Sequence, residues 1–295
     1  MTGVLVTGAA GFLGSAVCRA AALEGVSVVG LVRSGELVNP VDGVTYREID
    51  WTNGEAILGA LSEAAPERIV HCAGATPRAE MSAAELYDTN VGLVWRLLEH
   101  VTSEAPAGGV VVVSSAAVYG SAPSIPTAED EPLDPLTHYA WSKVLAEQAA
   151  RAFAATEGVR VCVARPFNLL GAGEPRGSVV SDVIQQLESG AEVVRVRETA
   201  SVRDFIDVDD AARALLLLAE RGEPGQAYNV CSGMGVTVAR LVDEILRAWG
   251  SSAAVEVLFP LDRGTTSVGN ACRLRGLGWV PSSSVGESLE RLRSL

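Results

Sequence analysis

A glycine-rich loop near the start of the chain, Thr7-Gly8-Ala9-Ala10-Gly11-Phe12-Leu13-Gly14, carries the strongest fold signal in this sequence. It directly follows a short β-rich run, residues 3–7, and it opens a helical pattern over residues 12–23. The glycines permit a sharp turn and let backbone N–H groups approach a pyrophosphate, while the helix N-terminus adds partial positive charge. A glycine pattern alone is a weak signal, but this order of strand, loop and helix predicts a dinucleotide-binding loop.

Four more apolar runs follow the loop, over residues 26–32, 44–49, 68–72 and 110–114. Continuous Val/Ile/Leu runs of this length are typical of strands buried on both faces of a parallel sheet. Helices fit between them, and Thr52-x-x-Glu55 and Ser82-x-x-Glu85 both have the form of a capping box at a helix start. The alternation predicts a doubly wound, Rossmann-type α/β domain that binds a dinucleotide, over residues 1–168.

The second half of the chain has shorter and more irregular elements. Helices are expected over residues 178–188, 208–220 and 237–249 and after Ser284-x-x-Glu287, and short strands over 193–196, 203–206 and 228–231. We interpret residues 169–295 as a smaller substrate-binding region above the carboxyl edge of the sheet, with roughly residues 204–231 packing back onto the first domain. No Ser/Gly-rich linker separates the two parts, so close packing is expected.

Composition excludes several classes of protein. The 295 residues include 36 acidic and 23 basic side chains, a net charge of −13, which argues against a nucleic-acid binder. Any anionic ligand therefore needs a local group of arginines. Five scattered cysteines without a CxxC pair indicate reduced thiols, a cytoplasmic protein and no metal site. The uncharged stretches 1–18 and 105–128 lack the features of a signal peptide and of a membrane helix, respectively.

The end of the second strand bears on the choice of cofactor. An acid there binds the ribose 2′-hydroxyl of NAD, whereas an arginine suits the 2′-phosphate of NADP. The chain reads Gly30-Leu31-Val32-Arg33-Ser34, with no acid at the usual position. Arg33 thus favours NADP(H), and NAD(H) remains open because Arg33 could also be a solvated loop residue. Asp50, after the third strand, could meet the adenine or cap a helix.

A Ser–Tyr–Lys pattern predicts hydride-transfer chemistry. Tyr139-Ala140-Trp141-Ser142-Lys143 puts the phenol and the amine on one face of a helix. A phenol with a pKa of about 10 is a poor catalyst at neutral pH, and a nearby ammonium should make Tyr139 more acidic. Ser115, just after the fifth strand in SSAAVYG, could hold a substrate oxygen at the carboxyl edge of the sheet.

Further motifs accompany these: Thr89-Asn90-Val91-Gly92, Arg165-Pro166-Phe167-Asn168, SVRDFIDVDD (201–210) and YNVCSG (228–233). Together they resemble the extended short-chain dehydrogenase/reductase superfamily, in its nucleotide-sugar branch of epimerase/dehydratase proteins, over essentially the whole chain. The RDFxDV and YNVCSG segments are similar to those of GDP-6-deoxy-4-keto-mannose reductases. The resemblance implies a nucleotide-diphosphate sugar as substrate and a homodimer built through a helix bundle.

The resemblance also implies residue roles. The catalytic residues would be Ser115, Tyr139 and Lys143. Asn168 and Arg203 would approach the substrate diphosphate, as would Arg263, for which a surface position is the alternative. The cofactor would meet Gly8, Ala10, Gly11, Phe12, Leu13, Gly14, Arg33, Asp50, Trp51, Cys72, Ala73, Gly74, Asn90, Tyr139, Lys143 and Pro166.

Three reactions compete. Dehydratase relatives carry acids after the catalytic Ser/Thr, where this chain has Ala116 and Ala117, so dehydration is disfavoured. NADPH-dependent reduction of the 4-keto group of an NDP-4-keto-6-deoxyhexose needs only the three catalytic residues and is the expectation. A nucleotide-sugar 4-epimerase with tightly bound NAD is the alternative, since SSAAVYG is epimerase-like. A non-catalytic NADP sensor is disfavoured because Tyr139 and Lys143 are both present.

Two positions depart from the family pattern. His138 stands before the catalytic tyrosine where the family often has proline. A packing or loop-capping role is favoured for it over a proton relay. Trp141 replaces a residue that is usually small, and it could shape the sugar pocket.

Overall fold

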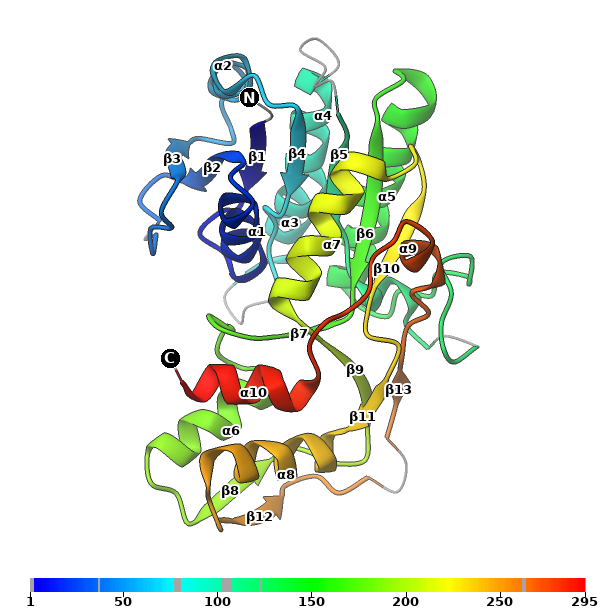
Figure 1. Ribbon diagram of the computed structural model, residues 1–295. Helices are drawn as coiled ribbons and strands as arrows, with labels where there is room; N and C mark the ends of the chain where they lie inside the picture. Colours follow the sequence, from blue (N-terminus) through cyan, green and yellow to red (C-terminus); the bar gives the residue numbers. More distant parts are fainter. Residues whose placement is uncertain are drawn as a thin grey trace.

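The computed structural model describes residues 3–36, 38–76, 81–101, 108–121, 124–261 and 264–294. Its centre is a seven-stranded sheet in the order β10-β6-β5-β4-β1-β2-β3, and every neighbouring pair is parallel (Figure 1). The strands are β1 (Gly3–Thr7), β2 (Ser27–Arg33), β3 (Val44–Ile49), β4 (Arg68–His71), β5 (Val110–Val113), β6 (Val161–Pro166) and β10 (Ala227–Val230). The chain changes direction between β1 and β4, where open α/β sheets bind ligands beyond the carboxyl ends of their strands.

Helices cover both faces of this sheet. Val4 and Val6 of β1 pack with α1 (Phe12–Leu23) and α7 (Val208–Arg221), whereas Leu5 packs on the other face. That second face is covered by α2 (Gly54–Ala64), α4 (Leu93–Val101) and α5 (His138–Thr156). Two apolar faces explain the continuous Val/Ile/Leu runs and confirm the predicted Rossmann-type α/β fold.

The remaining elements gather beyond one end of the large sheet (Figure 1). A small sheet contains β7 (Asn168–Leu170), β9 (Val202–Asp207), β11 (Gly235–Thr237) and β13 (Thr266–Ser267), and β8 (Val193–Val196) pairs with β12 (Ala254–Val257). The helices here are α6 (Val179–Glu188), α8 (Val238–Trp249) and α10 (Val285–Arg293), whereas α9 (Cys272–Gly276) lies beside β10 of the large sheet. Side chains of α6, α8, α10 and β8 share a separate hydrophobic core.

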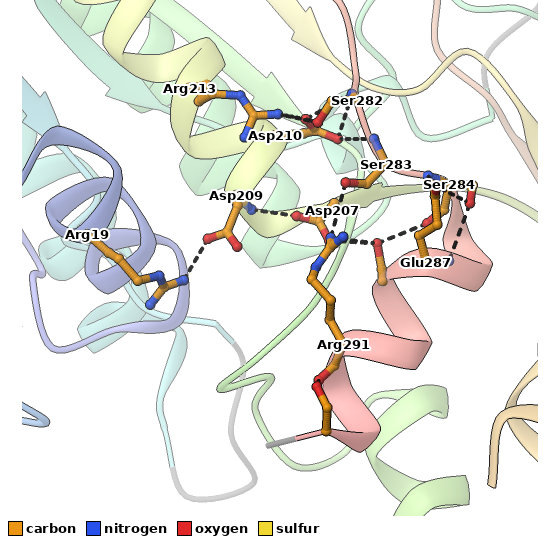
Figure 2. A network of polar contacts seen from close by, with 12 residues as sticks. Arg19, Asp207, Asp209, Asp210, Arg213, Ser282, Ser283, Ser284, Glu287 and Arg291 are labelled. Carbon is orange, nitrogen blue, oxygen red and sulfur yellow. Dashed lines mark hydrogen bonds and ion pairs between the residues drawn. The ribbon is translucent and has the colours of Figure 1, made fainter. Parts of the chain in front are cut away.

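Carboxylates at the start of α7 hold the C-terminal segment in place (Figure 2). Asp207 accepts hydrogen bonds from the Ser288 hydroxyl at 2.6 Å and from the Arg291 guanidinium. Asp210 accepts from the backbone N–H groups of residues 282–283, each at 3.0 Å. The C-terminal helix α10 is therefore fastened to the helix that packs against α1.

Helix starts follow the predicted caps with one exception. The short helix α3 (Ala83–Tyr87) and α10 both begin with the expected capping boxes, over 82–85 and 284–287. The box expected from Thr52 is wrong, because α2 is capped by Asn53, whose side chain accepts two backbone N–H groups of the first turn. The Asp50 carboxylate accepts both the hydroxyl and the backbone N–H of Thr52, at 2.7 and 2.9 Å, so Thr52 belongs to a turn before the helix.

Candidate active site

The structure brings Ser115 and Tyr139 together at the carboxyl edge of the sheet. Ser115 follows β5, and Tyr139 lies in the first turn of α5, which the Thr137 hydroxyl caps by accepting the Ala140 N–H at 3.1 Å. The Ser115 side chain lies close enough to the Tyr139 phenol to lower its pKa. The two side chains can thus share one substrate oxygen.

Lys143 is the only lysine in the sequence, and it is buried beside this pair. Its Nζ donates to the backbone carbonyl of Val113 at 3.0 Å. Burial lowers the pKa of Lys143 from 10.5 to about 8, while Cys72 and Glu147 act in the opposite direction. The ammonium therefore remains the main form at neutral pH, although its proton is held less tightly than that of an exposed lysine.

The pKa of Tyr139 is raised above 10.0 by burial, and the nearby Ser115 side chain offsets this only in part. Lys143 does not contribute to this shift. The expectation that the phenol of Tyr139 is made more acidic is therefore wrong for this structure, because burial raises its pKa. A protonated Tyr139 is nevertheless the form needed to donate a proton to a ketone.

The predicted cofactor residues of the glycine loop lie against the loop that follows β4. A Cβ on Gly8, whose φ is +65°, would lie 2.8 Å from the Ala73 backbone, and a Cβ on Gly14 would lie 2.1 Å from the Gly8 carbonyl oxygen. Gly11 provides the N-cap of α1 without a side-chain cap. The first N–H groups of α1 are therefore open to an anion, so the loop fits the pyrophosphate of a dinucleotide.

Asn90 connects the loop after β4 to α5, the helix that carries Tyr139 and Lys143. Its side chain exchanges two hydrogen bonds with the Ala75 backbone, at 2.8 and 3.0 Å, and donates to Ser142 Oγ at 2.9 Å. A Cβ on Gly74 would lie 2.9 Å from Asn90 Oδ1 and 3.2 Å from Lys143 Nζ. Two more predicted cofactor residues, Asn90 and Gly74, thus lie beside Lys143.

The end of β2 carries an acid that sequence reasoning missed. Arg33 is exposed there, and its backbone N–H donates to the Glu36 carboxylate at 3.2 Å. A turn with Gly35 at φ +77° brings Glu36 back to the strand end. The sequence has no acid at the usual position after the second strand, but in the folded chain the Glu36 carboxylate occupies this strand end. Glu36 and Arg33 therefore both lie at the end of β2, where dinucleotide-binding folds contact the ribose that carries the 2′-hydroxyl or 2′-phosphate.

The end of β3 holds two more of the predicted cofactor residues. Asp50 is exposed, and its hydrogen bonds from Thr52 lower the pKa of the carboxyl. The Trp51 ring packs edge-on against His71, with 6.2 Å between ring centroids. Asp50 is thus a turn-capping residue in this structure, one of the two roles left open for it.

Two cavities meet at the predicted substrate residues. One, of about 610 Å³, is lined by Ser115, Pro166 and residues 265–267. The other, of about 730 Å³, lies between α6 and β8. Asn168 and Arg203 line both cavities. The two predicted diphosphate contacts thus lie in the part of the lining that the two cavities share.

Hydrogen bonds to neighbouring segments fix the side chains of Asn168 and Arg203. Asn168 Nδ2 donates to the Asp204 carbonyl at 3.1 Å, across the β7–β9 pair. Arg203 donates to the carbonyl and the hydroxyl of Thr265, both at 2.7 Å. Arg263 lies outside the described residues.

Asp204 is a buried residue of the RDF motif whose role the sequence did not disclose. Its carboxylate accepts from the backbone N–H and hydroxyl of Ser232, at 2.9 and 2.6 Å, and from the N–H groups of Gly233 and Gly269, at 2.9 and 3.2 Å. These bonds tie the YNVCSG segment and the chain after β13 to β9. Asp204 therefore shapes the backbone that carries Arg203.

The two departures from the family pattern lie outside the catalytic cluster. His138 Nδ1 is 3.2 Å from the Tyr87 hydroxyl, and the two rings pack edge-on, which agrees with a packing role. Trp141 is 48% exposed and lines neither cavity, which gives no support to the expectation that it shapes the sugar pocket. It follows Ala140, which does face the catalytic cavity, so the helix turns the larger side chain away.

Within the described ranges, no helix is long and apolar enough to span a bilayer. The same residues contain no group of three His, Cys, Asp or Glu side chains arranged to hold a metal ion.

Comparison with known proteins agrees with this geometry. Residues 4–231 match the NAD dependent epimerase/dehydratase family, so the chain belongs to that family of nucleotide-sugar oxidoreductases, epimerases and dehydratases. Among curated relatives, GDP-6-deoxy-D-mannose reductase of Pseudomonas aeruginosa is 31% identical over 254 residues, covering 80% of this chain and 82% of the relative. UDP-glucose 4-epimerase of Mycolicibacterium smegmatis is 27% identical over 300 residues, covering 97% and 96%. The resemblance inferred from the motifs is confirmed.

Solved structures give the same result. The UDP-glucose 4-epimerase of Thermotoga maritima with UDP-glucose superposes with a TM-score of 0.89 at 27% identity, covering 99% of this chain and 98% of that one. RMD from Pseudomonas aeruginosa complexed with NADPH superposes with a TM-score of 0.85 at 28% identity, covering 100% and 98%.

Proposed function

We propose that the protein is a nucleotide-sugar 4-ketoreductase, which uses NADPH to reduce the 4-keto group of an NDP-4-keto-6-deoxyhexose. The observation that carries the proposal is a pair of cavities that share Asn168 and Arg203 in their linings, one of which is also lined by Ser115. A sugar fits beside Ser115, a diphosphate beside the shared Asn168 and Arg203, and a nucleoside in the other cavity. The 31% identity to GDP-6-deoxy-D-mannose reductase supports the same reaction class.

The cofactor would lie on the glycine loop, with its nicotinamide end toward Lys143 and Asn90. When bound, the nicotinamide supplies the hydride. The NADPH complex of the Pseudomonas structure and the exposed Arg33 support NADPH, whereas Glu36 at the same strand end supports NAD. We favour NADPH, because a guanidinium can bind a 2′-phosphate directly.

The chain's own residues supply the proton chemistry. Ser115 donates a hydrogen bond to the 4-keto oxygen and orients it. Tyr139, which burial keeps protonated, transfers its phenolic proton to that oxygen as C4 gains the hydride, so the carbonyl becomes a hydroxyl. Lys143, whose Nζ lies beside Gly74, would bind the nicotinamide ribose. Arg203 and Asn168 hold the diphosphate and fix C4 in place.

A 4-epimerase is the second candidate. It is supported by the Mycolicibacterium relative, which matches 97% of this chain, and by the Glu36 carboxylate at the end of β2. A dehydratase is disfavoured because Ala116 and Ala117, which line the catalytic cavity, carry no acid or base.

One set of incubations separates these reactions. The purified protein is mixed with GDP-, dTDP- or UDP-4-keto-6-deoxyhexoses and NADPH or NADH, and loss of the reduced cofactor is followed by absorbance. In parallel, UDP-galactose is added without any reductant, and UDP-glucose formation is measured by chromatography. Consumption of NADPH with a 4-keto sugar supports the reductase, whereas sugar interconversion without added cofactor makes the protein an epimerase.

We further propose that the protein is a homodimer. Trp95 of α4 is 50% exposed, and Trp141 and Leu145 of α5 are 48% and 44% exposed. Neighbouring large apolar side chains on two adjacent helices fit a two-fold interface in which α4 and α5 of both subunits form a bundle.

A further inference from the structure

A buried ion pair lies directly beneath the catalytic residues and has no part in the chemistry described above. Glu147 follows Lys143 by one helical turn and Tyr139 by two, so the three side chains share one face of α5. Arg165, at the end of β6, donates to both carboxylate oxygens of Glu147, from Nε at 2.9 Å and from Nη2 at 2.6 Å. The pair is bidentate, with strongly directional geometry.

This pair is also bonded to the segments on either side of Ser115. The Ser114 hydroxyl donates to Glu147 Oε1 at 2.6 Å. Arg165 Nη1 donates to the Tyr119 hydroxyl at 2.8 Å, at the end of the short 3-10 helix η2 (Ala116–Tyr119) that begins after Ser115. The backbone before and after Ser115 is thus held by one ion pair.

Stability alone does not account for such a pair. Its side chains are 1% and 0% exposed, whereas Arg291 in the Asp207–Arg291 pair is 50% exposed. Taking both charges out of water is costly, and well-packed apolar residues often replace such a pair without loss of stability. The burial of the Glu147 and Arg165 charges therefore needs an explanation other than stability.

The nearby Lys143 ammonium gives a reason for a buried negative charge at Glu147. The titratable groups that face it are His71 and Cys72 at the end of β4 and Glu147 on its own helix. Burial lowers the pKa of His71 to about 3 and raises the pKa of the Cys72 thiol, so both are neutral at pH 7. Glu147 is then the negative charge of this group. Beyond Glu147 stand two cations, Arg165 and, at 3.6 Å from the carboxylate, Arg151.

We propose that the Glu147–Arg165 pair is a positioning element of the active site, which holds the Ser115 segment in place and keeps Lys143 charged. The effect of this pair on catalysis rests on the proposed function, but its effect on the charge of Lys143 does not. Without the carboxylate, the Arg165 guanidinium would remain buried without a counter-charge near the ammonium. Lys143 should then lose its proton at a lower pH.

The single lysine makes this testable without substrate or cofactor. Protein labelled with ¹³C at lysine Cε gives one lysine side-chain NMR signal, and its titration reports the pKa of Lys143 directly. Glu147→Gln keeps the shape and an acceptor for Ser114 but removes the charge. We expect its Lys143 titration to fall by at least about one pH unit. The control Asp207→Asn alters a carboxylate paired with Arg291 elsewhere and should leave the Lys143 titration unchanged.

A second variant tests the proposal in case Glu147→Gln alone does not fold. Glu147→Gln/Arg165→Met removes both charges of the pair, so the Arg165 guanidinium is not left buried without a counter-charge. We expect it to fold, with kcat for the keto sugar at least about tenfold lower and KM within about threefold of wild type, because Ser115 is displaced rather than lost. An unchanged Lys143 titration in Glu147→Gln overturns the proposal, and so does a wild-type kcat in the double variant. A shifted titration in a protein without reductase activity supports the pair and removes the proposed function instead.

Discussion

The carbonyl oxygen of Val113 accepts a hydrogen bond of 3.0 Å from Lys143 Nζ. Val113 ends β5, and Ser115 follows two residues later, so this bond ties the catalytic helix α5 to the strand that delivers the serine. The ammonium of Lys143 is thus fixed two residues before Ser115. The pKa of the neighbouring Tyr139 is raised by burial.

Replacing the proposed proton donor should abolish turnover but not binding. Tyr139→Phe keeps the ring and removes the hydroxyl, so we expect kcat to fall by about 10²–10⁴. The Kd for NADPH, measured by fluorescence titration, should stay within about threefold of wild type, because the glycine loop is untouched. A rate equal to wild type would remove Tyr139 from the mechanism.

The reduction rate should fall as the pH rises past about 8, where Lys143 loses its proton. Stability should change in the opposite direction. The pKa of Lys143 is 10.5 in the unfolded chain and about 8 when folded, so the unfolded state binds more protons between these values. The contribution of Lys143 to the free energy of unfolding therefore increases from pH 8 to 10.5. A pH series of kcat/KM and of urea unfolding measures both trends, and a rate that rises across pH 8 contradicts the assignment.

The glycine loop should not tolerate a single added methyl group. In Gly14→Ala the new Cβ would lie 2.1 Å from the Gly8 carbonyl oxygen, so the loop must move and NADPH affinity should fall by at least about 100-fold. Gly59→Ala is the matched control, because nothing lies within 4 Å of a Cβ there. It should leave the NADPH Kd unchanged and raise the stability of α2 by about 0.5–1 kcal/mol. Equal NADPH affinity in the two variants would contradict the loop's role.

Cofactor choice should respond in opposite directions to two neighbours at the end of β2. Arg33→Ala removes the candidate ligand of a 2′-phosphate and should lower the preference for NADPH over NADH by about tenfold or more. Glu36→Gln removes a negative charge from the same place and should raise that preference. The ratio of the two Kd values is the measurement. If the ratio of the NADPH and NADH Kd values changed in the same direction in both variants, the end of β2 would not set the choice between the two cofactors.

The proposed subunit interface should be sensitive to charge. Leu145→Glu puts a carboxylate on the exposed apolar face of α5, and we expect the protein to become monomeric in size-exclusion chromatography with light scattering. Leu23→Glu changes a residue that is 83% exposed at the end of α1, and the dimer should persist. A monomeric wild-type protein, or a dimeric Leu145→Glu variant, would place the interface elsewhere or remove it.

Local patterns in the chain predicted most of the sheet, the dinucleotide loop and the helical spacing of Tyr139 and Lys143. These features depend on short-range physics: strand runs buried on two faces, glycines at a tight turn, and a four-residue spacing on a helix. The failed capping box at Thr52 marks the limit of that approach. Asp50 accepts the Thr52 hydroxyl, and Asn53 accepts the Glu55 N–H that a cap at Thr52 would have bound, so geometry decides between neighbouring polar side chains.

Long-range contacts decided the rest. The Glu36 carboxylate returns to the Arg33 N–H only because a turn folds it back, and Asp204 gathers backbone groups from segments up to 65 residues away. The pairing of Glu147 with Arg165 joins a helix to a strand 18 residues later. Burial is a property of the packed molecule and not of local spacing, so the amino-acid pattern identified the reactive groups while tertiary packing set their charges and partners.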